Sequence, residues 1–357
     1  MKVKNKKYTT IWLDKGNVKI IDQTKLPFEF KIVELKTTAD FCVAIKEMKV
    51  RGAPLIGITA AFGFAKALMK NPKNFNLEKS YHRLLDTRPT AVNLRWALEE
   101  IKKKVIAYSP EYRGKLAIKL AKSMRQNDIK ACKKIGLNGF EIIKKIYKKK
   151  KRSINILTHC NAGWLAAVDY GTALAPIFFA KKNNIPIHVW VDETRPRNQG
   201  ALLTSWELKN EKIPHTVIVD NAGGYLMQSG KVDLCLVGSD RTTINGDVCN
   251  KIGTYLKAIS AHENNIPFFV ALPTSTIDTR LNNGSKIPIE LRNGSELYET
   301  VIYKSKKITT GRIYPKNTKT LNPAFDVTPS RYITKLITEN GVCKSNEKSI
   351  KKIIRLI

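Results

Sequence analysis

The stretch INILTHCNAG, residues 154–163, joins a short apolar run to a polar loop, and this pattern recurs along the second half of the chain. Five such runs have the length of buried strands: Ile154–Leu157, Ile187–Val191, Thr216–Val219, Leu234–Val237 and Phe268–Ala271. Helical patterns lie between or after them, at Gly171–Lys182, Leu202–Lys209, Gly224–Gln228 and Asn250–Asn264. Continuous apolar strands that alternate with helices are typical of a parallel sheet covered on both faces. The sequence therefore predicts a doubly wound, mostly parallel, Rossmann-like α/β domain.

The first part of the chain follows a different pattern. Tyr8–Leu13 and Val18–Asp22 flank the turn sequence DKGN, which predicts a hairpin, and Phe28–Leu35 is a further candidate strand. Helical patterns follow at Thr38–Lys49, Gly57–Leu68, Val92–Ile106 and Leu116–Lys134. We predict a smaller α+β N-terminal domain at residues 1–127 and the Rossmann-like domain at residues 128–357, with the boundary near Gln126–Ile129.

Composition excludes several classes of protein. With 357 residues, 43% of them hydrophobic and 26% charged, the chain is long and apolar enough to bury a sizeable core and is not disordered. The six cysteines are scattered without a C-x-x-C pair, so we expect free thiols and no structural zinc site. The opening MKVKNKKYTTIW lacks the apolar centre of a signal peptide, and no window approaches a membrane span. We expect a cytoplasmic protein.

The formal net charge of +33 is the unusual feature of the composition. Taken alone it suggests an anionic partner such as nucleic acid. The excess, however, consists mostly of lysines spread over all surface segments, and no RNA-binding or zinc-finger signature accompanies it. The densest run, residues 144–152, fits the solvated face and the C-terminal end of an amphipathic helix, where cations are favoured. We therefore expect no specific nucleic-acid site.

Polar side chains follow each predicted strand of the second domain. In a doubly wound sheet the ligand binds beyond the carboxyl ends of the strands, so these loops are the place for a site. The loops read THCNAG at 158–163, DETRPRNQG at 192–200, DNAGG at 220–224, GSDR at 238–241 with NGDVCNK at 245–251, and PTSTID at 273–278. A purely structural protein does not need this concentration of reactive residues.

Six motifs in these and earlier segments carry a family resemblance. They are RGAPLIG at 51–57, RPTAVNL at 88–94, LTHCNAG at 157–163, ETRPRNQG at 193–200, NGDVCNKIGTY at 245–255 and NPAFDVTP at 322–329. Together, from about Trp12 to Val342, they resemble the S-methyl-5-thioribose-1-phosphate isomerases, the aldose-ketose isomerases of methionine salvage. The wider family includes ribose-1,5-bisphosphate isomerases and regulatory subunits of the translation-initiation guanine-nucleotide exchange factor.

The resemblance implies a set of site residues. The catalytic pair is Cys160 and Asp240. The implied substrate contacts are Arg51, Gly52, Ala53, Arg88, Gln199, Asn250 and Lys251. It also implies a sugar-phosphate substrate, a homodimer, and neither a metal nor another cofactor.

The chemistry of this reaction fits those residue types. The substrate carries its phosphate on the anomeric carbon, so the ring opens only if a group protonates the ring oxygen. Asp240 follows an apolar strand whose desolvation would keep the carboxyl protonated. Cys160, after another strand, could act as a thiolate base near the C2 hydrogen if helix N-terminal amides lower its pKa. Arg51 with Gly52, and Lys251 with a helix N-terminus near Asn250, could bind the phosphate. The sequence does not distinguish an enolate route from a hydride shift.

Each candidate also has a structural reading. Cys160 could be an inert buried cysteine, and Asp240 could cap the following segment. His159 next to Cys160 suggests a Cys–His dyad, but adjacent strand residues point to opposite faces, so we expect a structural role. Cys235, in mid-strand, should be core packing. Arg195 and Arg197 could form ion pairs with nearby acids such as Glu193, Asp192 or Glu207, and their role is open.

Three residues depart from the pattern we expect for the family, namely Trp164, Cys249 and Leu291. Trp164 and Leu291 could reshape the pocket around the 5-substituent. Two alternatives therefore stay open. The substrate could be a related 1-phosphorylated pentose, such as 5-deoxyribose 1-phosphate or ribose 1,5-bisphosphate, or the chain could be a non-catalytic regulatory subunit of the translation-factor type.

Overall fold

A seven-stranded sheet organises the second half of the molecule. The computed structural model describes residues 1–3, 6–88 and 91–354. The sheet has the order β18-β17-β12-β9-β6-β7-β8, and all neighbours are parallel except β17 and β18. Its strands are β6 (Ile154–Thr158), β7 (Ile187–Asp192), β8 (His215–Ile218), β9 (Leu234–Val237), β12 (Phe268–Ala271), β17 (Lys335–Thr338) and β18 (Gly341–Cys343). All five predicted strands are confirmed, and the doubly wound fold with them.

The strand order creates a switch point in the middle of this sheet. From β6 the chain moves outward in one direction through β7 and β8, and then from β9 in the other direction through β12 and β17. At such a point the loops after the two central strands diverge and leave a crevice between them, which is where ligands bind in open α/β sheets. The loops after β6 and β9 are therefore the first place to look for a site.

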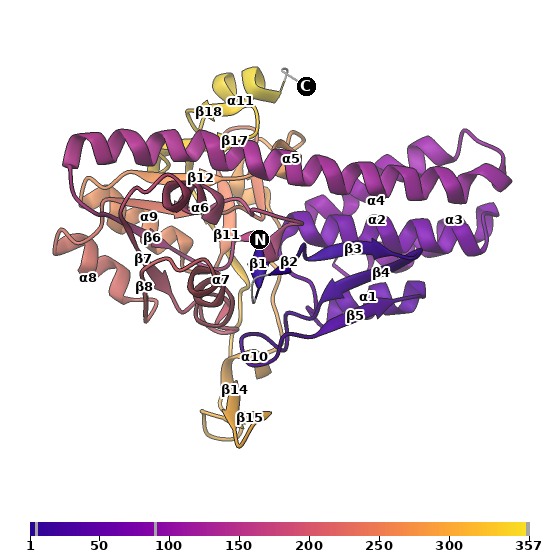
Figure 1. Ribbon diagram of the computed structural model, residues 1–357, viewed down its shortest axis with the longest axis horizontal. Coiled ribbons are helices and arrows are strands. Elements are labelled where there is room, and N and C mark those ends of the chain that lie inside the picture. Colours follow the sequence, from indigo (N-terminus) through magenta and orange to yellow (C-terminus); the bar gives the residue numbers. More distant parts are fainter. Residues whose placement is uncertain (4–5, 89–90, 355–357) are drawn as a thin grey trace.

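Helices cover both faces of the sheet (Figure 1). On one face α5 (Pro110–Lys150) and α6 (Leu174–Lys182) pack over β6 and β17, and their apolar side chains share one core with the sheet. The other face carries α8 (Ala222–Gln228), α9 (Thr254–Glu263) and α11 (Glu347–Ile354), which share a second core. Burial on both faces explains why the strands lack an alternating pattern. Cys235 is fully buried there, in agreement with its predicted packing role.

A smaller four-stranded sheet has the order β13-β10-β11-β16. Its strands are β10 (Arg241–Thr243), β11 (Val248–Lys251), β13 (Ile277–Asp278) and β16 (Phe325–Thr328). Asn250 and Lys251 thus lie on a strand, and the helical prediction for Asn250–Asn264 is wrong at its start, because α9 begins only at Thr254. The hairpin of β14 (Glu299–Lys304) and β15 (Lys307–Arg312), preceded by α10 (Ser295–Tyr298), projects from this region (Figure 1).

The N-terminal part contains the predicted hairpin, formed by β3 (Ile11–Asp14) and β4 (Asn17–Ile21), with β5 (Ile32–Leu35) paired to β4. The two-stranded pair of β1 (Lys2–Val3) and β2 (Lys6–Lys7) precedes it. The third strand is shorter than predicted because residues 25–29 form a turn. The helices here are α1 (Thr38–Lys46), α2 (Ala53–Lys70), α3 (Asn74–Leu85) and α4 (Val92–Val105). Together they form a small α+β unit around α2, as predicted.

The 41-residue helix α5 connects the two parts. Its first half contributes Ala117 and Ala121 to the N-terminal core, and its second half contributes Ile135 and Ile143 to the core of the large sheet. Figure 1 shows it running along the length of the molecule. The boundary predicted near Gln126–Ile129 therefore falls inside a continuous helix and not in a linker. The lysine run lies at the C-terminal end of α5, as predicted.

Helix α2 is central to the N-terminal core. Among the described residues it is the one helix long and apolar enough to cross a membrane, but 78% of that window is buried inside the protein. The core helix of a folded domain passes the same test of length and composition. The N-terminus of α2 points toward the strand ends of the large sheet, where it meets the loop after β6.

Candidate active site

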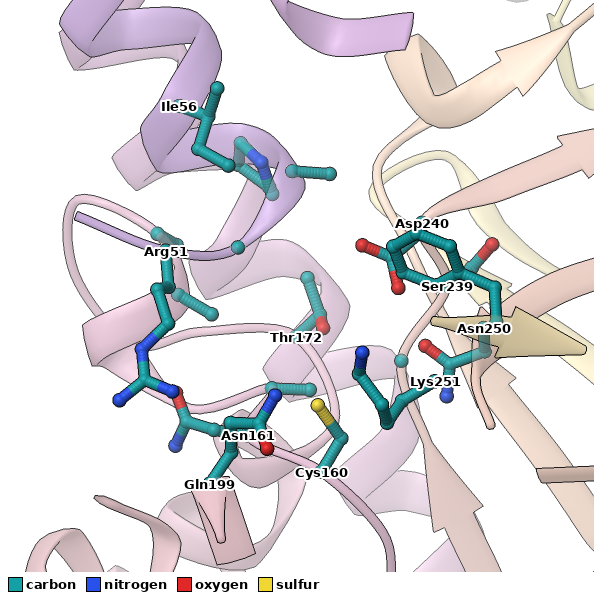
Figure 2. Close-up of a pocket in the computed structure, with 18 of the residues that line it drawn as sticks. Arg51, Ile56, Cys160, Asn161, Thr172, Gln199, Ser239, Asp240, Asn250 and Lys251 are labelled. Carbon is teal, nitrogen blue, oxygen red and sulfur yellow. The ribbon is translucent and has the colours of Figure 1, made fainter. Parts of the chain in front are cut away.

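A cavity lies between the N-terminus of α2 and the carboxyl ends of the strands of the large sheet (Figure 2). It brings together residues from segments that are far apart in the sequence. All nine residues predicted from the sequence line it: Arg51, Gly52, Ala53, Arg88, Cys160, Gln199, Asp240, Asn250 and Lys251. Pro89 and Thr90, in the motif that contains Arg88, lie outside the described residues.

The thiol and the carboxyl of the predicted catalytic pair meet at the switch point of the sheet. Cys160 lies two residues after β6 ends, and Asp240 lies three residues after β9 ends. Because β6 and β9 are neighbours in the sheet, both side chains reach the same crevice from its two walls. In Figure 2 the sulfur of Cys160 and the side chain of Lys251 lie between Arg51 on one side and Asp240 on the other.

The backbone holds Cys160 in an uncommon conformation. Its φ is 66°, in the left-handed region that non-glycine residues rarely adopt. The Cys160 N–H donates to Thr194 Oγ1 at 2.9 Å, and its carbonyl accepts from Thr204 Oγ1 at 2.7 Å. A non-glycine residue held in this region costs of order 1–3 kcal/mol and persists only where the surroundings fix it, often at functional sites. The two threonines fix the backbone on both sides of the thiol.

The electrostatic setting of Cys160 differs from the prediction. Burial raises the pKa of the Cys160 thiol, and the charge of Lys251 lowers it by less. The expected helix N-terminus is absent here, since residues 164–166 form only a single 3₁₀ turn in the described structure. A thiolate here is stabilised by the charge of Lys251, by the backbone N–H of Asn161 and by the charge of Arg51.

Asp240 has the character that the sequence predicts for an acid. Burial raises the pKa of its carboxyl, while the positive charges of Lys251 and Arg88 oppose that shift. A carboxyl with a raised pKa keeps its proton closer to neutral pH and can donate it. The Asp240 backbone N–H donates to the Cys249 carbonyl at 3.0 Å, which ties this loop to β11.

The start of α2 has the features of an anion-binding site. Gly52 has a φ of 86°, and a Cβ there would overlap the carbonyl oxygen of Ala166, so only glycine fits this close approach. Gly52 and Ala53, at the N-terminus of this 18-residue helix, line the cavity, and a helix N-terminus favours negative charge. Beside them, Arg51 Nε and Nη1 are buried without a partner among the described residues. Buried guanidinium N–H groups without partners indicate a bound anion.

Sequence reasoning missed one cation of the site, Arg292, which lines the same cavity and is 7% exposed. Its Nε and Nη2 atoms lie 3.0 and 3.3 Å from the two oxygens of Glu290, which also lies 3.4 Å from Arg88 Nη2. One carboxylate thus orients two arginines. Arg292 and Lys251 also contact the ring of Phe325, at 5.5 and 4.6 Å. The signal that could have revealed Arg292 is the segment IELR at 289–292, in which an acidic and a basic residue alternate with apolar ones.

The cavity as a whole is strongly cationic. It contains Arg51, Arg88, Lys251 and Arg292 against one carboxyl group among its described lining residues, that of Asp240. Burial is the main cause that lowers the pKa of Lys251 to about 8, and Arg292 adds to it by repulsion. Lys251 Nζ donates to the Ala324 carbonyl at 2.7 Å, which aims the ammonium at the cavity wall. Such a cluster suits a doubly charged phosphate.

His159 does not form a dyad with Cys160. Its Nδ1 lies 2.9 Å from Asp192 Oδ2, and its Nε2 lies 2.8 Å from the Ile252 carbonyl. His159, Asp192 and Asp220 are close enough to hold a metal ion, but Lys257 Nζ lies 3.3 Å from Asp192 Oδ2. An ammonium already supplies positive charge there, so we interpret the cluster as a buried ion-pair network below the site. The structural role expected for His159 fits this position.

The structure also places the other residues whose roles the sequence left open. Arg197 pairs at 2.7 Å with Glu296, and not with any of the acids considered above, because α10, which carries Glu296, lies next to the loop after β7. Arg195 donates to two carbonyls, those of Pro196 and Leu297. Trp164 is buried against Trp206, and Leu291 is 67% exposed. Neither lines the cavity, so the suggestion that they reshape the pocket is not supported.

Comparisons with known proteins bear on this site. Residues 49–345 match the model of the Initiation factor 2 subunit family. The chain is 53% identical over 359 residues to a methylthioribose-1-phosphate isomerase of Sinorhizobium medicae, covering 99% of both chains. It is 51% identical to one of Escherichia coli, covering 98% of this chain and 95% of the relative.

Solved structures give the same fold. The 5-methylthioribose 1-phosphate isomerase of Pyrococcus horikoshii is 38% identical, with a TM-score of 0.85, over 99% of this chain and 97% of that one. The delta subunit of translation initiation factor eIF-2B of A. fulgidus is 36% identical, with a TM-score of 0.79, over 98% of this chain and all of that one. Several relatives near 50% identity carry the isomerase name.

Proposed function

The chain belongs to the Initiation factor 2 subunit family and, within it, to the methylthioribose-1-phosphate isomerases, and on this premise we propose that it converts 5-methylthioribose 1-phosphate to 5-methylthioribulose 1-phosphate in methionine salvage. The observation that carries the proposal is the cavity at the switch point, which one acid and one thiol line together with four cations. A purely regulatory subunit has no need of that pair.

The proposed reaction is an internal redox change without a cofactor. Asp240 donates a proton to the ring oxygen while the bond from that oxygen to C1 breaks. The hydrogen on C2 moves to C1, and the C2 hydroxyl loses its proton and becomes the ketone, so Asp240 can recover a proton. Cys160 assists the transfer between C2 and C1, with Lys251 and Arg51 favouring its thiolate. The phosphate stays on the oxygen of C1 throughout.

Substrate recognition is proposed to centre on the phosphate. The α2 N-terminus at Gly52 and Ala53, with the unpartnered N–H groups of Arg51, forms the main anion site. Arg88 and Arg292, both oriented by Glu290, and Lys251 complete the positive field. Gln199 Oε1 is buried without a partner in the described structure and is free to accept a sugar hydroxyl. We propose Arg292 as a substrate contact in addition to those predicted from the sequence.

The test is a coupled assay of ketose formation from 5-methylthioribose 1-phosphate, run in parallel with ribose 1,5-bisphosphate and 5-deoxyribose 1-phosphate. We expect kcat/KM to be highest for the methylthio substrate. If kcat/KM were higher for either of the other two sugars, that sugar would replace the methylthio compound as the proposed substrate. If none of the three sugars were turned over, the alternative of a non-catalytic regulatory subunit of the translation-factor type would be favoured.

We expect kcat/KM to fall as the pH rises through about 8. Burial lowers the pKa of Lys251 to about 8, so the ammonium that faces the phosphate is present below this pH and is lost above it. A bound phosphate dianion favours the ammonium, so the alkaline limb of kcat should lie at higher pH than that of kcat/KM. The check is a pH profile of both constants. An arginine cannot deprotonate in this range, so in Lys251→Arg the alkaline fall of kcat/KM should shift to higher pH. If the fall stayed at the same pH, it would have to be assigned to the titration of another group, such as Asp240.

The homodimer predicted from the resemblance has a candidate surface. β8 is the edge strand of the large sheet, and Val217, Val219 and Tyr225 in and after it are 42%, 61% and 64% exposed. Exposed apolar residues at a sheet edge promote association. We expect light scattering to give about twice the 40.3 kDa chain mass. Val219→Lys and Tyr225→Lys should each shift it toward the monomer. A monomeric wild type, or two variants that remain dimeric, would contradict this surface.

A further inference from the structure

Glu207 is a fully buried carboxylate that the proposed reaction does not use. It lies on α7 (Ser205–Asn210), which directly follows the π-helical turn at Gly200–Thr204, and is 0% exposed. It forms no ion pair in the part of the chain that the structure describes. Instead it accepts three hydrogen bonds from the loop that carries Cys160. They come from Asn161 Nδ2 at 2.8 Å, from the Trp164 N–H at 2.8 Å and from the Leu165 N–H at 3.2 Å.

The loop is built closely around this carboxylate. A Cβ at Gly163 would overlap Glu207 Oε2, and one at Gly171 would overlap the backbone of Gly163. The fit requires glycine at both positions, so the contact is a specific feature of the loop and not a chance approach. Burial raises the pKa of Glu207 to about 8, yet all three contacts are N–H donors, which the ionised carboxylate satisfies best.

The amide of Asn161 transmits this contact toward the substrate. One hydrogen of Asn161 Nδ2 meets Glu207 Oε1, and the other faces Thr204 Oγ1 at 3.2 Å. Thr204 in turn donates to the Cys160 carbonyl at 2.7 Å. Both amide hydrogens are therefore used, while Asn161 Oδ1 is buried without a partner in the described residues, and Asn161 lines the cavity. If the amide were reversed, its oxygen would face a carboxylate, which is unfavourable.

We propose that Glu207 is a positioning residue that fixes the Cys160–Leu165 loop and turns the carbonyl oxygen of Asn161 toward the substrate, where it accepts a hydrogen bond from a ring hydroxyl. The substrate part of this inference rests on the proposed function. The positioning part does not, because it concerns only contacts within the chain. Asn161 is then a further substrate contact. Glu207 affects the reaction indirectly, because it orients the amide of Asn161 and holds the loop in which Cys160 has its left-handed backbone conformation.

The central experiment is a rescue. Glu207→Gln keeps the size of the side chain but replaces one acceptor by an NH₂ donor, which lets Asn161 reverse and present its own NH₂ to the substrate. We expect kcat/KM to fall by about 10- to 100-fold, the range in which small displacements of reacting groups act. In the double variant Glu207→Gln/Asn161→Asp, both oxygens of the new carboxylate at position 161 are acceptors. One can accept from the NH₂ of the glutamine at position 207, and the other can accept from the substrate hydroxyl. This variant should recover most of the loss, which a general loss of stability would not do.

Two controls separate this proposal from the proposed function. Glu211→Gln changes a carboxylate just beyond α7 whose partner is the Lys2 N–H, and it should behave as wild type. The rate of Cys160 alkylation by iodoacetamide, mapped by peptide mass spectrometry, needs no substrate. It should rise several-fold in Glu207→Gln, because the loop that carries Cys160 is released and its thiol becomes more accessible.

The outcomes are distinct. If the wild type shows no isomerase activity but Glu207→Gln alone changes the alkylation rate, the proposed function fails and the positioning role stands. If Glu207→Gln matches Glu211→Gln in both kcat/KM and alkylation, the positioning role is wrong. If the double variant is no more active than Glu207→Gln, the orientation of Asn161 is not what Glu207 controls.

Discussion

Asp240→Asn should lower kcat by at least about 10²-fold, the usual size of a lost general acid or base, while leaving the fold intact. An amide cannot donate a proton to the ring oxygen, and the substitution keeps the shape of the side chain in the loop after β9. Cys160→Ser should have an effect of similar size, since a serine hydroxyl ionises far less readily than a thiol and supplies almost no anionic base at neutral pH. Single-turnover kinetics with the methylthio substrate measure both losses.

The double variant tests whether the two groups act as a unit. Because both line one cavity and would act in the same reaction, Asp240→Asn/Cys160→Ser should be little slower than the slower single variant. Cys343→Ser, a change at a distant and half-buried thiol, serves as the matched control and should keep wild-type turnover. Near-wild-type kcat in either active-site variant would remove that residue from the mechanism.

Arg51→Ala should weaken substrate binding by about 1.5–3 kcal/mol, the usual value for hydrogen bonds to a charged group, or roughly 10- to 150-fold. The reason is that Arg51 has two buried nitrogens, Nε and Nη1, without a partner in the described part of the chain, next to the N-terminus of α2. Arg51→Lys should recover only part of this loss, because an ammonium cannot replace a planar guanidinium that binds two phosphate oxygens at once. Calorimetry in the Asp240→Asn background measures binding without turnover.

The dephosphorylated sugar provides the control for this prediction. It should bind far more weakly than the substrate, and Arg51→Ala should change its affinity little. Lys251→Ala should show the same dependence on the phosphate. If both sugars bound the wild type equally, the anion site at the start of α2 would have to be assigned to another ligand.

The sequence by itself determined the large sheet and predicted where the candidate site lies. The apolar runs at Ile154–Leu157 and Leu234–Val237 are local patterns, and repeated runs of this kind between helices are typical of a parallel sheet that is buried on both faces. Cys160 and Asp240 follow these strands, so the rule that ligands bind at carboxyl ends places both without knowledge of any contact.

The tertiary structure alone decided which groups meet across long separations. Glu290 orients Arg88, 202 residues away, and Glu207 holds Asn161, 46 residues away. It also placed Asn250 and Lys251 on the strand β11, because pairing with β16 supplies backbone partners that local propensity does not reveal. In the same way Trp164 is removed from the cavity by packing against Trp206. A side chain finds its partners through the crossing of distant elements, and that geometry is set by packing of the whole core and not by the neighbours of a residue in the chain.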